Sequence, residues 1–171
     1  MSHNDLSNPA NLSRVLSMLV TNDTKTIRAA EKQLKVFMKK PASVTSMLNQ
    51  IHSNPLAEVR HQAALMLKKK MCQHYSKIGA ANQQVVRTQI FALLKNESNR
   101  SIAVAIAGCI STLAKGVFSV GSHWPELFAN LSELGQSTNE TYRYLAYSLL
   151  EQVRVELLVF IIVWLVDWLF C

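Results

Sequence analysis

The stretch LAEVRHQAALMLKKKM at residues 56–71 constrains the fold more than any other part of the sequence. Val59, Ala63, Met66 and Leu67 recur at helical spacing, while the basic side chains fall mostly outside that stripe. The small residues in the stripe let a second helix approach closely. The stretch therefore predicts a helix whose narrow apolar seam packs against a neighbouring helix.

Similar stretches recur along the chain, each as the second helix of a predicted pair. They read TIRAAEKQL, EVRHQAALML, SIAVAIAGCI and TYRYLAYSLL, and anchoring them on Arg28, Arg60, Ala103 and Arg143 gives spacings of 32, 43 and 40 residues. Periods of roughly 40–47 residues with two helices each are typical of HEAT or armadillo repeats. No segment shows strict apolar–polar alternation. We expect an all-α HEAT-repeat α-solenoid of about four antiparallel helix pairs.

Turn residues and apolar periodicity set the expected boundaries. Helices are predicted at about 9–20, 24–40, 41–52, 56–74, 82–96, 98–116, 122–135 and 139–152. Asp23 or Thr24 is expected to cap the second helix, and Gly116 to end the sixth. The predicted organisation is a flexible N-terminus at 1–8, repeats at 9–152 and an atypical apolar segment at 153–171.

The last segment, VRVELLVFIIVWLVDWLFC, does not continue the repeat pattern. A membrane-spanning helix needs about 20 apolar residues, and Glu156 and Asp167 interrupt this one. We expect a truncated product of a longer protein, from splicing or a faulty gene model. The alternative is a tail-anchored HEAT adaptor, with membrane contact by residues 155–171. Both interpretations leave apolar surface exposed and predict self-association.

Positive charge is concentrated in the first half of the chain. Residues 1–80 carry 12 basic and 4 acidic side chains, whereas residues 81–171 carry 6 and 7. Such a basic half is either a set of solvated helix faces or a surface for nucleic acid or acidic proteins.

Nothing in the sequence indicates an enzyme. A Gly-rich phosphate loop, a metal-ligand spacing and a paired nucleophile and base are all absent from the sequence. Cys72, Cys109 and Cys171 are too widely spaced for a disulfide framework or a zinc site, and Cys109 is expected in the core. The polar start is not a signal peptide, which fits the cytosol or nucleus. We expect no catalytic residues, cofactor, metal or small-molecule substrate.

Several motifs resemble the N-terminal part of importin-β-type nuclear transport receptors (karyopherins), over about residues 10–152. EVRHQAA at 58–64, followed by LKK at 67–69, matches the Val/Ile-Arg-x-x-Ala-Ala…Leu-Lys pattern of the importin N-terminal domain. Residues 89–97 are similar to the third helix pair, and WPEL at 124–127 is similar to the Trp-Pro-x-Leu that opens the fourth. The branch that the chain resembles is importin-4-like, whose members carry histones and ribosomal proteins.

The resemblance implies an adaptor in nucleocytoplasmic protein import. Family members bind the small GTPase Ran in its GTP form through their N-terminal repeats, and Ran binding releases import cargo in the nucleus. Carried over to this chain, the helices that meet Ran imply contacts at Arg28, Lys32, Arg60, Ala64 and Lys68. Arg60 is alternatively a structural tie between repeats. Import cargo, such as histones or ribosomal proteins, would bind through the full-length form, in the cytoplasm and nucleus.

Overall fold

Eight α-helices make up the fold of residues 5–170. The computed structural model describes residues 5–170, and it describes their side chains except those of residues 72, 155–157 and 159–170. The helices are α1 (Pro9–Met18), α2 (Thr24–Phe37), α3 (Ser43–Ser53), α4 (Ala57–Tyr75), α5 (Ala80–Asn96), α6 (Arg100–Ser119), α7 (Pro125–Gly135) and α8 (Glu140–Phe170). No strand occurs among residues 5–170. The predicted all-α class is therefore confirmed, and most helix boundaries lie within about three residues of the expected ones.

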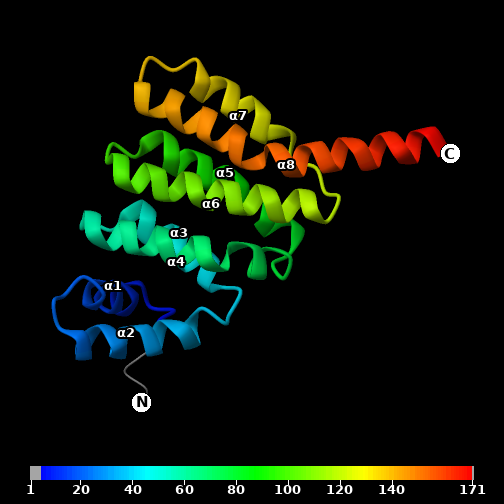
Figure 1. Cartoon of the computed structure of the whole chain (residues 1–171). Helices are drawn as coiled ribbons and strands as arrows, with labels where there is room; N and C mark the ends of the chain where they lie inside the picture. The colour runs from blue at the N-terminus through cyan, green and yellow to red at the C-terminus, as the bar shows by residue number, and fades with distance from the viewer. Residues whose placement is uncertain (1–4, 171) are drawn as a thin grey trace. The chain divides into compact units, whose positions relative to one another are not determined.

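The chain divides into two compact units, Met1–Cys109 and Ile110–Cys171. In the first unit α1 packs on α2 and α3 packs on α4, and the pairs also touch one another through α1 with α3 and α4, and through α3 with α5 (Figure 1). In the second unit α7 packs on α8. Each helix buries one apolar stripe against its neighbours, which is the packing that helical repeats require.

Side-chain caps start the first two helices, at Asp23, which was one of the two predicted positions, and at Asn8, which was not predicted. The Asp23 side chain accepts hydrogen bonds from the backbone N–H groups of Lys25 and Thr26, at 3.1 and 3.0 Å. Asn8 caps α1 in the same way, through a 2.9 Å bond from the Ala10 N–H, and Pro9 occupies the first turn. These bonds satisfy backbone donors that have no partner inside the helix.

Residues 5–8 correct the expectation of a flexible N-terminus. Leu6 is buried, and the Asp5 carboxylate accepts a hydrogen bond from the Ser7 N–H at 3.0 Å. The Asn11 side chain also donates to the Asp5 carbonyl oxygen, at 3.2 Å. The reason is that Leu6 is a large apolar side chain beside α2, and its burial orders the turn that leads into α1.

The expected end of the sixth helix at Gly116 was wrong. Helix α6 continues to Ser119, and the chain turns at Gly121, whose φ of 70° lies in the left-handed region. Gly116 has ordinary helical geometry, because a glycine inside a helix is tolerated when its neighbours pack well. Val117 and Phe118 are buried, which explains why the extra turn forms.

Helix α8 runs without interruption from Glu140 to Phe170, so the predicted change of character at residue 153 is not a break in the helix. Side chains of the apolar segment lie outside the described ones, apart from Val153, Arg154 and Leu158. Within the part of the chain that the structure describes, α6 alone is long and apolar enough to cross a membrane, and 72% of its most apolar stretch is buried inside the protein. The buried core helix of a globular protein passes the same test.

Candidate interaction surface

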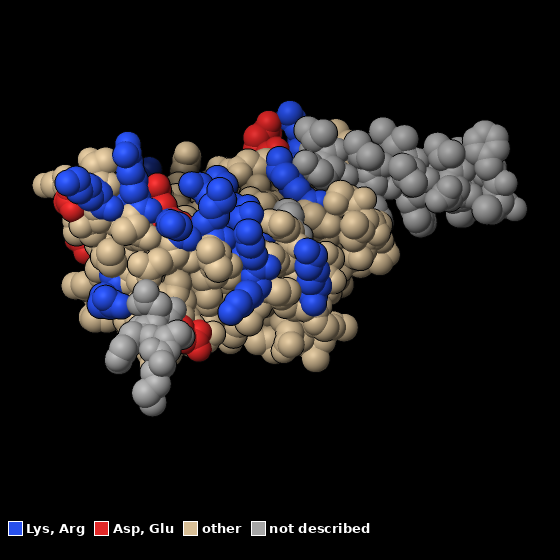
Figure 2. Space-filling view, turned by 90° about the horizontal axis from the view of Figure 1, so that it is seen from below, with Lys and Arg blue, Asp and Glu red and all other residues tan. Residues whose placement is uncertain are grey.

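A stripe of basic side chains follows the exposed side of α2. Its members, spaced three or four residues apart, are Lys25, Arg28, Lys32 and Lys35, and Lys39 continues the spacing just after the helix ends. Residues with this spacing share one helix face, and all five are exposed. Figure 2 shows Lys and Arg side chains gathered on the face that it views, with few Asp or Glu among them. The α2 stripe contains two predicted contact residues, Arg28 and Lys32.

Arg60 has a structural role near the start of α4. Its Nε and one terminal nitrogen donate to the two carboxylate oxygens of Glu97, at 3.2 and 3.3 Å, and its other terminal nitrogen donates to the Asn54 carbonyl at 3.2 Å. The side chains of Arg60 and Glu97 are 19% and 8% exposed. The Glu97 carboxylate also accepts from the Asn99 N–H, so Arg60 ties α4 to the turn between α5 and α6.

Ala64 does not reach the surface. Its side chain is fully buried, and its carbonyl accepts a hydrogen bond from the Cys109 thiol at 3.2 Å. Met66, expected in the seam, is only half-buried, so the buried stripe of α4 runs through Ala64 in its place. The small size of Ala64 lets the backbone of α4 approach α6, which explains the alanine at this position.

Burial raises the pKa of the Cys109 thiol to about 12, despite the opposing effect of the nearby Lys68 charge. In a chain with Cys72→Ser and Cys171→Ser, we expect Cys109 to resist iodoacetamide at pH 8 and to react once urea unfolds the protein. The raised pKa also means that stability is full below about pH 9 and falls as the pH rises toward 12, because only the unfolded thiol ionises there. Rapid labelling of the folded chain would contradict this burial.

Lys68 is exposed and lies across the first half of α6. A Cβ on Gly108 would lie 3.1 Å from both Cδ and Nζ of Lys68. The absence of a side chain at Gly108 therefore leaves the space that the Lys68 side chain occupies. The aliphatic part of Lys68 is held against α6, and its ammonium group sits at the surface. Lys68 therefore presents a positioned charge on α4.

A buried histidine provides another tie that the sequence did not indicate. His74, near the end of α4, lies with its Nε2 2.6 Å from the carbonyl oxygen of Met38, the residue that directly follows α2. The residue is 1% exposed. The only signal in the sequence was its position one helical turn after the buried Met71.

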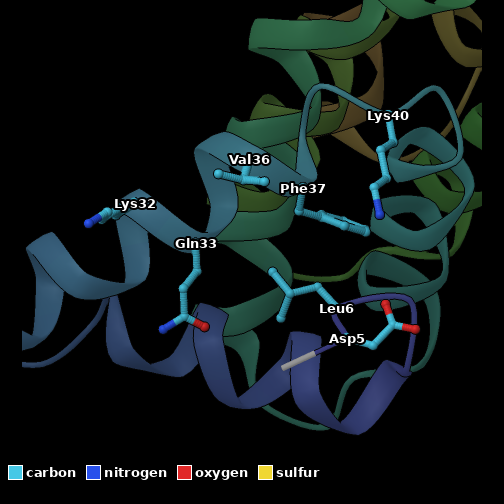
Figure 3. A pocket seen from close by; sticks show the side chains of 7 residues that line it. All are labelled: Asp5, Leu6, Lys32, Gln33, Val36, Phe37 and Lys40. Carbon is cyan, nitrogen blue, oxygen red and sulfur yellow. The ribbon is translucent and has the colours of Figure 1, made fainter. Parts of the chain in front are cut away.

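A groove beside α2 was also not predicted. It has a volume of about 330 Å³, and Figure 3 shows Leu6 and Phe37 inside it, with Lys32 and Lys40 at its two ends. The remaining lining residues are Asp5, Gln33 and Val36. The groove depends on Leu6, which lies in the segment that the sequence led us to expect as flexible.

No group of three or more His, Cys, Asp or Glu side chains within the described part of the chain could hold a metal ion. What the described surface offers is positive charge on α2 and α4 and an apolar groove next to it. Stacked helix pairs with such a surface define an α-helical repeat module of the HEAT type, suited to binding other macromolecules.

Comparisons with known proteins identify the family that this module resembles. Residues 30–96, from α2 to the end of α5, match the model of the importin-beta N-terminal domain. Mouse Importin-4 is 24% identical over 134 residues, 78% of this chain and 12% of the relative. A probable importin subunit beta-4 of Schizosaccharomyces pombe is 26% identical over 150 residues, 85% of this chain and 14% of the relative. The resemblance to the importin-β family, and in it to the importin-4-like branch, is confirmed.

Solved structures agree on the fold. The crystal structure of Kap121p matches with a TM-score of 0.75 at 19% identity, over 88% of this chain and 15% of that one. Kap121p bound to Nup53p matches with a TM-score of 0.74 at 18% identity, with the same coverage. The chain thus spans about one seventh or less of the length of these relatives and structures.

Proposed function

We propose that this chain is the Ran-binding segment of a nuclear import receptor. The observation that carries the proposal is the importin-beta N-terminal domain at residues 30–96, because that domain is the one through which family members meet Ran-GTP. The relatives named importins support a role in protein import, in which the receptor moves between cytoplasm and nucleus. Cargo binding belongs to a longer form with further repeats.

The proposed contact surface consists of exposed cations on the second helices of the first two pairs. Arg28 and Lys32 project from α2, and Lys68 projects from α4. Together they offer three positive charges to an acidic partner surface. Arg60 and Ala64 support this surface from within, because the first is paired with Glu97 and the second is buried.

A binding experiment tests the proposal directly. The immobilised chain is expected to retain Ran loaded with a non-hydrolysable GTP analogue and to release Ran loaded with GDP. The triple variant Arg28→Glu, Lys32→Glu, Lys68→Glu should weaken binding at least about tenfold, because each change replaces attraction by repulsion. Surface plasmon resonance measures both effects.

The matched control is Lys77→Glu, which makes the same charge change at an exposed position after α4 and should alter binding less than about twofold. If the chain retains both nucleotide forms of Ran equally, or retains neither form, the proposal is contradicted.

The α2 stripe favours a second function, a basic HEAT-repeat scaffold for nucleic acid or acidic proteins. Retention of an oligonucleotide with a steep loss of affinity as salt rises would favour that function.

A further inference from the structure

We infer that the groove between α2 and the N-terminal turn binds a short acidic peptide segment that carries one bulky apolar side chain. The inference does not rest on Ran binding, because most of the groove lies outside the contact surface proposed above. It rests on the apolar floor of the groove and the charges around it.

The floor of the groove is apolar and already formed. Leu6 and Phe37 are buried and line it from the N-terminal turn and from α2 (Figure 3). Val36, on the same wall, is 61% exposed and stands in a helix face that is otherwise basic. The exposed apolar surface of Val36 contributes favourable free energy only when a partner covers it and removes it from water.

Size limits what enters the groove. A volume of about 330 Å³ is near the lower end of the roughly 300–1,000 Å³ of ligand-binding clefts. It accommodates one large side chain with the adjoining peptide backbone. The occupant is therefore a short extended segment rather than the surface of a folded domain.

Charge selects an acidic segment. Lys32 and Lys40 stand at opposite ends of the groove. Asp5 is the one acidic residue in the lining, and its carboxylate accepts the Ser7 N–H. The bond from Ser7 lowers the pKa of Asp5, and the charge of Lys40 lowers it further. The lysines exceed this one carboxylate, so side chains flanking an apolar anchor are favoured when they are acidic.

Fluorescence anisotropy with labelled pentapeptides tests the inference on the full chain. The probe Glu-Asp-Phe-Asp-Glu is expected to bind about tenfold more tightly than Glu-Asp-Ser-Asp-Glu, because only the first has an apolar anchor. Val36→Asp should weaken binding of the phenylalanine peptide about tenfold. Lys32→Glu and Lys40→Glu should each weaken it about fivefold. All three positions are exposed, so the variants should fold.

Two controls match these changes outside the groove. Lys35→Glu alters the same stripe, and Val85→Asp places a carboxylate at an exposed valine of α5; each should change binding less than about twofold. Equal binding of both peptides, equal effects of Lys35→Glu and Lys40→Glu, or no binding of the phenylalanine peptide would overturn the inference. If oligothymidine binds more tightly than the phenylalanine peptide, and Val36→Asp leaves that binding unchanged, the site is a general polyanion-binding surface instead.

Discussion

Arg60→Ala is expected to lower the free energy of unfolding by about 3 kcal/mol. The change leaves the Glu97 carboxylate, which is 8% exposed, without the guanidinium that neutralises it at 3.2 and 3.3 Å. Breaking a buried ion pair by removing one partner costs about 3–5 kcal/mol, and the partial exposure of Arg60 places the effect at the lower end. Urea denaturation followed by circular dichroism measures the loss.

Two further variants separate the lost charge pair from other effects. Arg28→Met removes an exposed arginine from α2 and should cost less than about 0.5 kcal/mol. The double variant Arg60→Met, Glu97→Gln removes both charges and should be about 1–2 kcal/mol more stable than Arg60→Ala, because the carboxylate is neutralised together with the loss of its guanidinium partner. A double variant no more stable than Arg60→Ala would show that Arg60 does not stabilise through this pair.

Trp124→Ala is expected to destabilise the second unit by about 3–5 kcal/mol, the usual cost of removing a large buried aromatic side chain. Trp124 is 1% exposed and directly precedes α7, whose Leu127, Leu131 and Leu134 are also buried. The substitution leaves a cavity that these leucines cannot fill. Thermal unfolding should show a lowered midpoint for the structure that includes α7 and α8.

Phe128→Ala is the matched control for this change. Phe128 is another aromatic residue of the same helix, but it is 44% exposed, so its removal should cost less than about 1 kcal/mol. Similar losses in the two variants would mean that Trp124 contributes no more than a surface aromatic residue. That result would contradict the burial of Trp124.

Most of the fold can be predicted from local residue patterns in the sequence. The cap at Asp23 and the apolar stripes are local to single helices, so residue type and spacing locate them, whereas the Asn8 cap lies in a segment that was expected to be flexible. Local patterns could not predict where α6 ends, because the local sequence makes Gly116 and Gly121 equally suitable residues for terminating a helix. Burial of Val117 and Phe118 carries the helix past the first glycine, and burial depends on residues far away in the sequence.

The interaction surface was only partly predictable for the same reason. Exposure of Arg28 and Lys32 follows from the amphipathic pattern of α2, whereas Ala64 fits either the seam or its edge by spacing. Only the Cys109 thiol, 45 residues along the chain, shows that Ala64 faces α6. The groove depends in turn on Leu6 reaching α2, and no pattern in the short polar N-terminus predicts this contact.

The packing of the first unit has a consequence for how the protein is made. Helix α1 contacts α2, α3 and α4, and α3 contacts α4 and α5, so contacting residues are separated by short lengths of chain. Chains dominated by such local contacts fold quickly, because little loop entropy is lost before contacts form. Helix α1 therefore has these packing partners once α4 has left the ribosome, and this part of the first unit can fold while the rest of the chain is still being synthesised.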